Sequence, residues 1–166
     1  MNETYGALYV YYNGTYYTWN GVGSADQYVM PGMGFMIAPG DNGTLDLTNA
    51  CRAHYIPMKS SNTNENTIVF KAGNETFSDE LCVVFNEEAS SSFDLQYDAW
   101  KLMTEEADIP QLYSVMGEKQ LSIDQQPQCD QIPVGFTCGE SGDYSFSIGE
   151  STFEGPVFIE DTKTGS

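Results

Sequence analysis

The chain has 166 residues, of which 40% are hydrophobic and 13% aromatic, so it is long and apolar enough for one sizeable core and is not a disordered chain. Only 6 Lys and Arg residues stand against 24 Asp and Glu, a formal net charge of −18 that is expected to repel nucleic acid and anionic membranes. No apolar run has the length of a membrane span, so we expect no nucleic-acid binding and no membrane insertion. Cations, neutral sugars and basic partners remain compatible, and solubility is the simplest interpretation of the charge.

An all-β domain is favoured by the 11 Tyr and 9 Phe residues, together with 16 Gly and 7 Pro that supply turns. The clearest local signal comes first in the chain. Two β-rich runs, residues 7–12 and 15–19, flank Asn13-Gly14, and this dipeptide is typical of a type I′ hairpin turn.

The stretch 28–56 reads as strand, turn and strand, and we expect it to organise the core. Pro31-Gly32 and Pro39-Gly40 bound a short apolar run at 34–38, which is typical of a buried strand. Residues 41–43 then predict a turn, and residues 44–47 a following strand.

Further strands are expected along the rest of the chain. Residues 93–102 alternate poorly and suit a single helical turn, while Gly117-Glu118 predicts a type II′ turn between two strands. The expected strands are 67–71, 81–85 (central), 111–116, 119–123, 132–137, 143–148 and 156–160. Residues 161–165 read as a turn without a returning strand, so we expect a strand after residue 162 to be missing or supplied by a neighbouring subunit.

These patterns predict one domain over residues 1–166: an antiparallel, two-sheet β-sandwich, jelly-roll-like, with about ten short strands and little helix. The four cysteines, Cys51, Cys82, Cys129 and Cys138, lack the CxxC spacing of a zinc or redox site. Their even number fits an exported protein with disulfides. We expect Cys51 to pair with Cys82 and Cys129 with Cys138; free thiols are the alternative.

Aromatic residues supply the candidate ligand site. Tyrosines of the first hairpin fall on both faces, so some must lie outward. A sugar-stacking platform would use Tyr16, Tyr17, Trp19 and Trp100; cross-strand aromatic pairs or contact with a second sheet are the structural alternative.

Catalytic chemistry has little support. His54 is the only histidine, which excludes multi-histidine metal sites, and no nucleophile elbow is present. Arg52 and His54 are expected on one face of a strand, with Arg52 partly buried against Asp94 or Asp98. No cofactor is expected. Calcium is the one metal left open, at the oxygen-rich loops 41–46 and 105–108, although neither has EF-hand spacing and solvated loops are the simpler interpretation.

Several segments together resemble the β-sandwich modules near the C-terminal ends of large exported surface proteins of Bacteroidetes, just ahead of a type IX secretion sorting region. The segments span residues 8–162 in order and are structural in character: 17–21, 30–38, 51–54, 84–89, 93–102, 110–114, 132–136 and 157–161. The family pattern usually has Gln where Met33 stands, and fewer cysteines. The resemblance implies export and surface display, and it does not imply an enzyme.

We therefore expect a non-catalytic, extracellular or cell-surface module with a structural or adhesive role. A sharper hypothesis is a filament-forming subunit that donates a strand to the next copy, through self-association or through neighbouring domains of a larger protein. The alternative is a carbohydrate-binding module of a secreted protein. A carboxylate glycosidase is the third hypothesis, but among 24 acids the sequence favours no particular pair.

Overall fold

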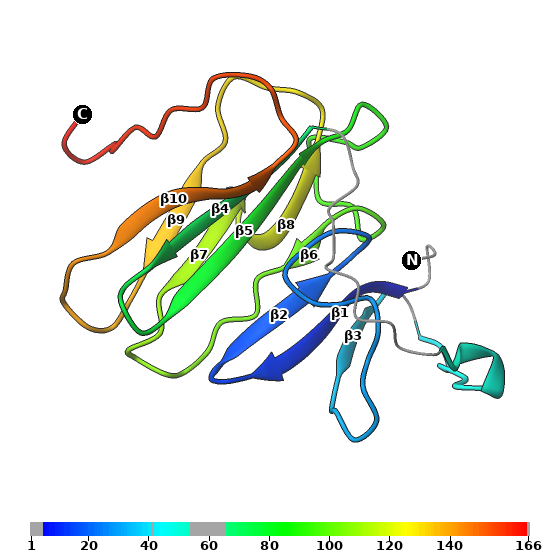
Figure 1. Cartoon of the computed structure of the whole chain (residues 1–166). Helices are drawn as coiled ribbons and strands as arrows, with labels where there is room; N and C mark the ends of the chain where they lie inside the picture. Colours follow the sequence, from blue (N-terminus) through cyan, green and yellow to red (C-terminus); the bar gives the residue numbers. More distant parts are fainter. Residues whose placement is uncertain (1–4, 41, 54–65, 166) are drawn as a thin grey trace.

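The computed structural model describes residues 5–40, 42–53 and 66–165, and these residues form an all-β structure of two sheets (Figure 1). A 3₁₀ turn, η1 (Asn49–Cys51), is the single helical element in the described ranges. The strands are β1 (Tyr5–Tyr12), β2 (Thr15–Trp19), β3 (Met36–Pro39), β4 (Thr67–Gly73), β5 (Ser78–Phe85), β6 (Ala99–Trp100), β7 (Gln111–Met116), β8 (Lys119–Gln126), β9 (Val134–Thr137) and β10 (Ser145–Ser151). The predicted all-β class, with about ten strands and little helix, is confirmed.

The smaller sheet has the order β2-β1-β3 and is antiparallel throughout. Its hairpin turns at Asn13 and Gly14, whose φ angles of 51° and 86° are both positive, as a type I′ turn requires. Tyr12 lies opposite Thr15 across this turn, so the predicted hairpin is confirmed with its register.

The larger sheet has seven strands in the order β10-β4-β5-β8-β7-β9, with β6 paired to β8. β5 is central, as predicted. The β7–β8 hairpin turns at Gly117, whose φ is 63°, with Met116 opposite Lys119, in agreement with the predicted type II′ turn. The prediction of a wholly antiparallel arrangement is wrong, because β5 and β8 run parallel. Residues 86–118 between them are long enough to make the crossover that a parallel pair needs.

Two apolar clusters hold the sheets. The first joins β1 of the smaller sheet to β4, β5 and β8 of the larger one; its buried members are Ala7, Tyr9, Val22, Val69, Cys82, Val84, Ala99 and Ile123. The second lies on the other face of the larger sheet and contains Ala72, Leu81, Val83 and Leu112. The larger sheet curls over this second cluster, which brings Phe136 of β9 within 5.1 Å of Phe146 of β10, measured between ring centroids. The two end strands of this sheet therefore meet through aromatic side chains.

Two expected strands do not form. Residues 44–47 are exposed and lie outside any strand, and residues 156–160 are likewise not part of a sheet. The run at 34–38 does contribute β3, but β3 is a half-exposed edge strand rather than a core strand. The described residues of the stretch 28–56 therefore do not organise the core; β5 and its neighbours do. Residue 41 of the expected turn lies outside the described residues.

All four cysteines are free thiols in the structure, so neither predicted disulfide is present. Cys82 is 4% exposed on β5, where it packs in the cluster between the sheets, whereas Cys51 lies on the exposed η1 turn. Cys129 is exposed, and the Cys138 sulfur lies 3.0 Å from the Tyr144 hydroxyl. In the described ranges, no helix combines the length and apolar character that a bilayer crossing would require.

Candidate functional site

A cleft on the first hairpin is the strongest candidate site, and its shape follows from local sequence. Val10 lies directly opposite Tyr17 in the β1–β2 register, so both side chains share one face of the hairpin. The chain leaves β2 and returns, so that residues 24–33 line a hollow together with that face. The Thr18 N–H donates to Ser24 Oγ at 3.1 Å, and the Ala25 N–H donates to the Thr18 carbonyl at 2.9 Å. These two bonds fix the start of the returning loop against β2.

Gly23 makes this close return feasible. Its φ is 121°, and a Cβ at this position would lie 2.3 Å from the Thr18 carbonyl oxygen. A side chain would therefore be both strained and in contact with backbone, and glycine alone suits the position.

A second turn shapes the far wall of the cleft. Met30-Pro31-Gly32-Met33 closes with a 3.0 Å hydrogen bond from the Met33 N–H to the Met30 carbonyl, and Gly32 has a φ of 84°. Proline followed by a glycine of positive φ is the signature of a type II turn. The turn brings Met30 and Met33 to the same hollow.

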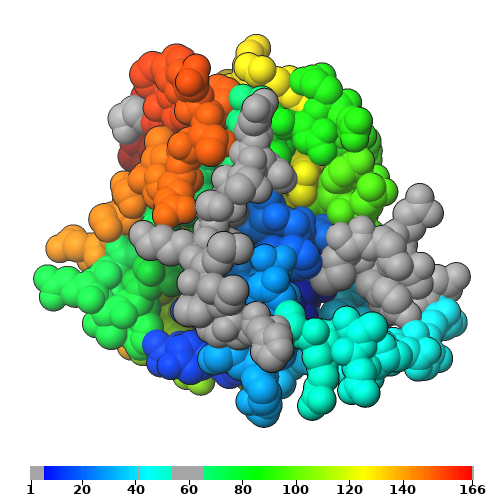
Figure 2. All heavy atoms as spheres, turned by 45° about the vertical axis from the view of Figure 1, so that its right-hand side comes forward, coloured from blue at the N-terminus to red at the C-terminus, as the bar shows by residue number. Residues whose placement is uncertain are grey.

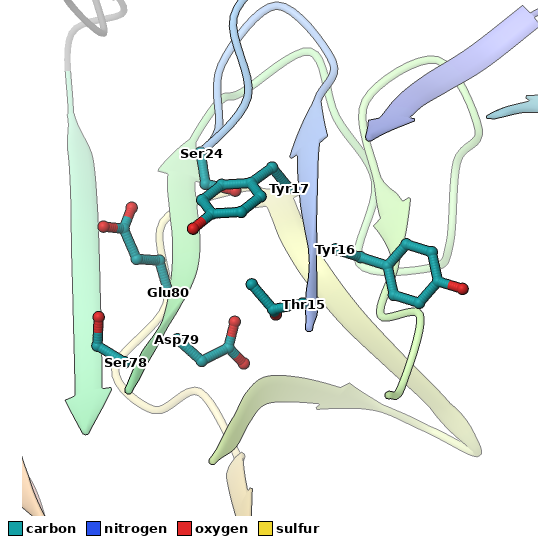
Figure 3. A pocket seen from close by; sticks show the side chains of 7 residues that line it. All are labelled: Thr15, Tyr16, Tyr17, Ser24, Ser78, Asp79 and Glu80. Carbon is teal, nitrogen blue, oxygen red and sulfur yellow. The ribbon is translucent and has the colours of Figure 1, made fainter. Parts of the chain in front are cut away.

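The cleft has two parts that share Tyr17 and Ser24. The polar hollow, about 70 Å³, is lined by Thr15, Tyr16, Tyr17, Ser24, Ser78, Asp79 and Glu80 (Figure 3). The tyrosine hollow, about 200 Å³ and more open, is lined by Val10, Tyr12, Tyr17, Ser24, Ala25, Asp26, Tyr28, Met30 and Met33. In Figure 3 the Tyr17 hydroxyl points toward Glu80, whereas Tyr16 points away from the hollow. Tyr17 therefore stands between an acidic end and an apolar, aromatic end.

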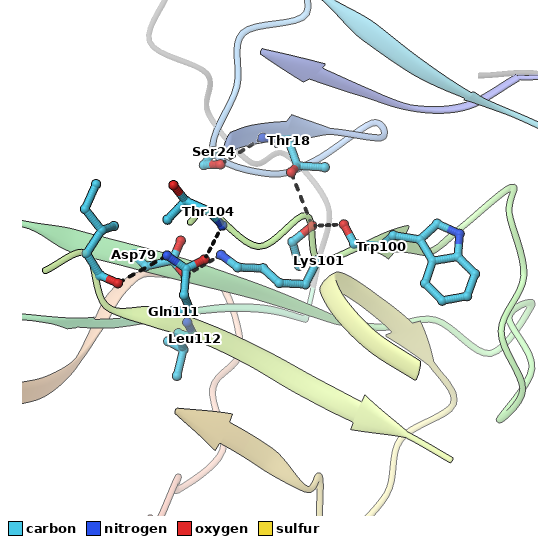
Figure 4. A network of polar contacts seen from close by, with 10 residues as sticks. Thr18, Ser24, Asp79, Trp100, Lys101, Thr104, Gln111 and Leu112 are labelled. Atoms are coloured by element: carbon cyan, nitrogen blue, oxygen red, sulfur yellow. Dashed lines mark hydrogen bonds and ion pairs between the residues drawn. The ribbon is translucent and has the colours of Figure 1, made fainter. Parts of the chain in front are cut away.

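The acidic end is already neutralised in part. Asp79 forms a buried ion pair with Lys101, and Glu80 pairs with Lys71 at 2.5 Å (Figure 4 shows the first pair). Burial, and then the charges of Glu80, Tyr12 and Asp79, raise the pKa of Tyr17 above its usual value, so the phenol stays protonated at neutral pH.

The four predicted aromatic site residues are not brought together. Tyr16 and Tyr17 both line the polar hollow, but only Tyr17 reaches the tyrosine hollow. The rings of Tyr16 and Tyr11 lie 4.9 Å apart, which is the cross-strand pairing named as the structural alternative. Trp19, half-buried on β2, lines neither hollow.

Trp100 has a different setting. Its ring lies 4.5 Å from that of Phe93, and the Lys119 ammonium sits 4.5 Å from the Trp100 centroid. A cation over the ring and a ring beside it leave little of this indole for sugar stacking.

The expected pairing of Arg52 with Asp94 or Asp98 does not form. Arg52 is exposed after η1, while Asp98 is fully buried and accepts hydrogen bonds from the N–H groups of Asp94 and Gln125, at 2.7 and 2.9 Å. Asp94 uses its carboxylate to accept from the Gln96 N–H. Backbone donors have taken the place of the expected guanidinium. His54 lies outside the described residues.

Asp98 illustrates a perturbed acid with a structural role. Burial raises its pKa to about 7, against the opposing effect of its two backbone donors. A raised pKa is common at catalytic sites, but Asp98 lines neither hollow, and its two oxygens accept from the turn that precedes β6 and from Gln125 of β8. Among the described residues, no cluster of three or more His, Cys, Asp or Glu is placed to hold a metal ion, and Asp41 of the first predicted calcium loop lies outside those residues.

Sequence reasoning missed most residues that line the two hollows, among them Asp26, Tyr28, Met30 and Met33. The Met-Pro-Gly-Met turn was the available signal, since it predicts that its two methionines project from one tight loop. Comparison with known proteins matches residues 2–166 to a family model described as "Domain of unknown function (DUF8693)". No curated protein and no solved structure matches the chain.

Proposed function

The chain belongs to the DUF8693 family of unknown function, and we propose that it is a non-catalytic structural or adhesive module that joins copies of itself by strand addition. The observation that carries the proposal is the outer edge of β10. This strand pairs with β4 on one side, and no strand in residues 5–40, 42–53 or 66–165 pairs with its other side.

β10 has the properties of a pairing template. Its seven residues are almost all exposed, and Phe146 and Ile148, which share one face, expose 48% and 46% of their surface. β10 carries no lysine, and its contact with β9 is made by aromatic side chains, so another strand could pair with the N–H and C=O groups of its outer edge.

The proposed partner segment is residues 156–160 of a second copy. Phe158 and Ile159 expose 87% and 63% of their surface, and the segment runs over the molecular surface without entering a sheet (Figure 2, orange to red). In an added strand Phe158 and Ile159 point to opposite faces, so one of the two would lie beside Phe146 and Ile148 of a partner's β10. Because each copy carries a net charge of −18, we expect association to strengthen as salt screens the repulsion.

Within this proposal the architecture is a jelly-roll-like β-sandwich forming one domain. The support is the apolar cluster shared by the two sheets, which contains Tyr9 from β1 and Cys82 from β5. Export and display at the cell surface, and the extension of pairwise joining into an extracellular filament, rest on the resemblance to exported surface modules and on the open edge of β10.

The test is light scattering and electron microscopy of the chain over rising protein and salt concentration. We expect concentration-dependent oligomers for the natural sequence, and their loss in the double variant Phe158→Ser/Ile159→Ser. Leu47→Ser is the matched control, since Leu47 is 66% exposed in a different loop. Equally strong assembly of the double variant would show that residues 156–160 are not the partner segment. A monomer under all conditions would refute the proposal.

Carbohydrate binding is the second candidate, and the polar hollow favours it. Tyr17 offers a ring for stacking beside the hydroxyl groups of Thr15 and Ser24 and the carboxylate of Glu80. A glycan array with the natural chain and Tyr17→Ala tests it, with Trp19→Ala as the control for a residue outside the hollow. If no polysaccharide binds the natural chain, this candidate is excluded.

A further inference from the structure

The tyrosine hollow has a composition suited to a particular ligand chemistry. Three tyrosines, Tyr12, Tyr17 and Tyr28, and two methionines surround a space of about 200 Å³, and Asp26 is its one acidic lining residue among those described. Aromatic faces attract cations through the ring quadrupole, most strongly cations with an apolar, weakly hydrated shell. Methionine adds a polarizable, adaptable surface.

Asp26 supplies the charge at this hollow. One of its carboxylate oxygens, Oδ1, accepts the Tyr28 N–H at 3.0 Å, which fixes the side chain at the rim. Within the described part of the chain, ion pairs join Lys71 to Glu80 and Lys101 to Asp79, and none involves Asp26. Unlike the acids of the polar hollow, Asp26 has no cationic partner among the described residues.

We propose that the tyrosine hollow binds an alkylated ammonium cation, such as the trimethylammonium group of choline. The apolar methyl shell would contact the tyrosine and methionine side chains, while Asp26 balances the charge. This site is separate from the β10 edge and does not depend on strand addition.

The surroundings also indicate which carriers of that group are accepted. Asp79 and Glu80 line the adjoining polar hollow, and the whole chain has a net charge of −18, so a ligand with a phosphate beside its ammonium is disfavoured. A sugar is a poorer fit than a cation here, because a neutral sugar needs several directed polar groups and the lining is mainly apolar.

Methyl NMR of the methionines reports directly on this site, because Met30 and Met33 belong to its wall. The probes are choline, tetramethylammonium and 3,3-dimethylbutan-1-ol, a neutral molecule with the shape of choline, each titrated at constant ionic strength. We expect choline and tetramethylammonium to shift the Met30 and Met33 signals saturably, and the neutral alcohol to bind about tenfold more weakly.

Two matched pairs of variants locate the effect. Tyr12→Ala and Asp26→Asn are expected to weaken choline binding several-fold; Asp26→Asn keeps the oxygen that accepts the Tyr28 N–H. Tyr11→Ala, a tyrosine of the same strand outside the hollow, and Asp46→Asn, an equal charge change elsewhere, are expected to leave it unchanged.

Two further probes distinguish the sources of the ammonium group. A trimethyl-lysine peptide is expected to bind like choline, and phosphocholine more weakly. Equal binding of choline and the neutral alcohol would overturn the proposal, as would the absence of saturable shifts with every probe or phosphocholine binding as tightly as choline.

Discussion

The buried ion pair between Lys101 and Asp79 gives the sharpest test of the described packing. Their side chains expose only 2% and 6% of their surface, and Asp79 also accepts the Leu112 N–H at 2.6 Å, so the carboxylate ties β5 to β7 and to the segment after β6. Lys101→Met removes the ammonium and leaves a buried carboxylate with the Leu112 donor. Breaking such a pair from one side costs about 3–5 kcal/mol of unfolding free energy. That is a large share of the roughly 5–15 kcal/mol that stabilises a domain.

Lys71→Met is the matched control, because Lys71 pairs with Glu80, the next residue of β5, but the two side chains are 42% and 31% exposed. An exposed pair contributes at most about 1 kcal/mol. The assay is urea unfolding followed by tryptophan fluorescence, with the midpoint compared at unchanged slope. Equal losses for the two lysine variants would refute the assignment of Lys101 and Asp79 to a buried, coupled pair.

A second substitution separates the lost charge from lost packing. Asp79→Asn on the Lys101→Met background keeps an oxygen for the Leu112 N–H and removes the unpaired charge. We therefore expect the double variant to be more stable than Lys101→Met alone. A further loss of stability would mean that the carboxylate is not left uncompensated by the first substitution.

Three further outcomes follow from other described residues. Gly14→Ala is expected to lower the free energy of unfolding by about 1–3 kcal/mol, because the φ of Gly14 is 86° and a Cβ would lie 2.3 Å from Ile109 Cδ1. Gly117→Ala should lower it by about 1 kcal/mol, since Gly117 has a positive φ but open space around it. Similar losses of stability for the two variants in thermal unfolding would contradict the steric argument. The pKa of Asp98 is about 7 in the folded state and about 3.9 in the unfolded state, so the folded state binds more protons between these two pH values. The stability of the natural chain relative to Asp98→Asn should therefore fall by up to about 4 kcal/mol as pH rises from about 4 to about 7. If urea unfolding shows a stability difference that does not change with pH, Asp98 titrates normally. Burial raises the pKa of the Cys82 thiol to about 12, so mass spectrometry should find Cys82 alkylated only after unfolding, whereas exposed thiols should react at once. Rapid labelling of Cys82 in the native protein would be inconsistent with its place between the sheets.

Local chemistry accounts for what the sequence predicted correctly. Asn13-Gly14 specifies its own turn because both residues tolerate positive φ, and the run around Cys82 indicates a central strand because it is apolar on both faces. These signals involve neighbours in the chain, so no knowledge of the tertiary structure is needed.

The errors involve partners that are distant in the chain. Residues 44–47 and 156–160 have apolar side chains, but apolar character cannot reveal whether a neighbouring strand is present to pair with them. The parallel alignment of β5 and β8 is likewise set by the path of the crossover between them. A disulfide requires two sulfurs in specific geometry, and the burial of Cys82 on β5 depends on the packing of both sheets.

The candidate site was partly accessible from sequence. Tyr17 was predicted among outward aromatic residues, and it does line the cleft. Asp79 could not be singled out from 24 acids, because its importance comes from burial and from a donor far away in the chain. Asp98 was named as a partner of Arg52, but its donors are the N–H groups of Asp94 and Gln125. Asp26 gains its place at the rim only through the return of the loop over β2.

Hydrogen exchange of β10 tests the proposed joining of copies most directly. In dilute protein, the N–H groups on the outer edge of β10 should exchange quickly, since only its β4 side is paired. As concentration and salt increase, we expect alternate amides of residues 145–151 to become protected, together with amides of residues 156–160, while β5 and β8 remain unchanged. Oligomers that form without any new protection at β10 would contradict strand addition at this edge.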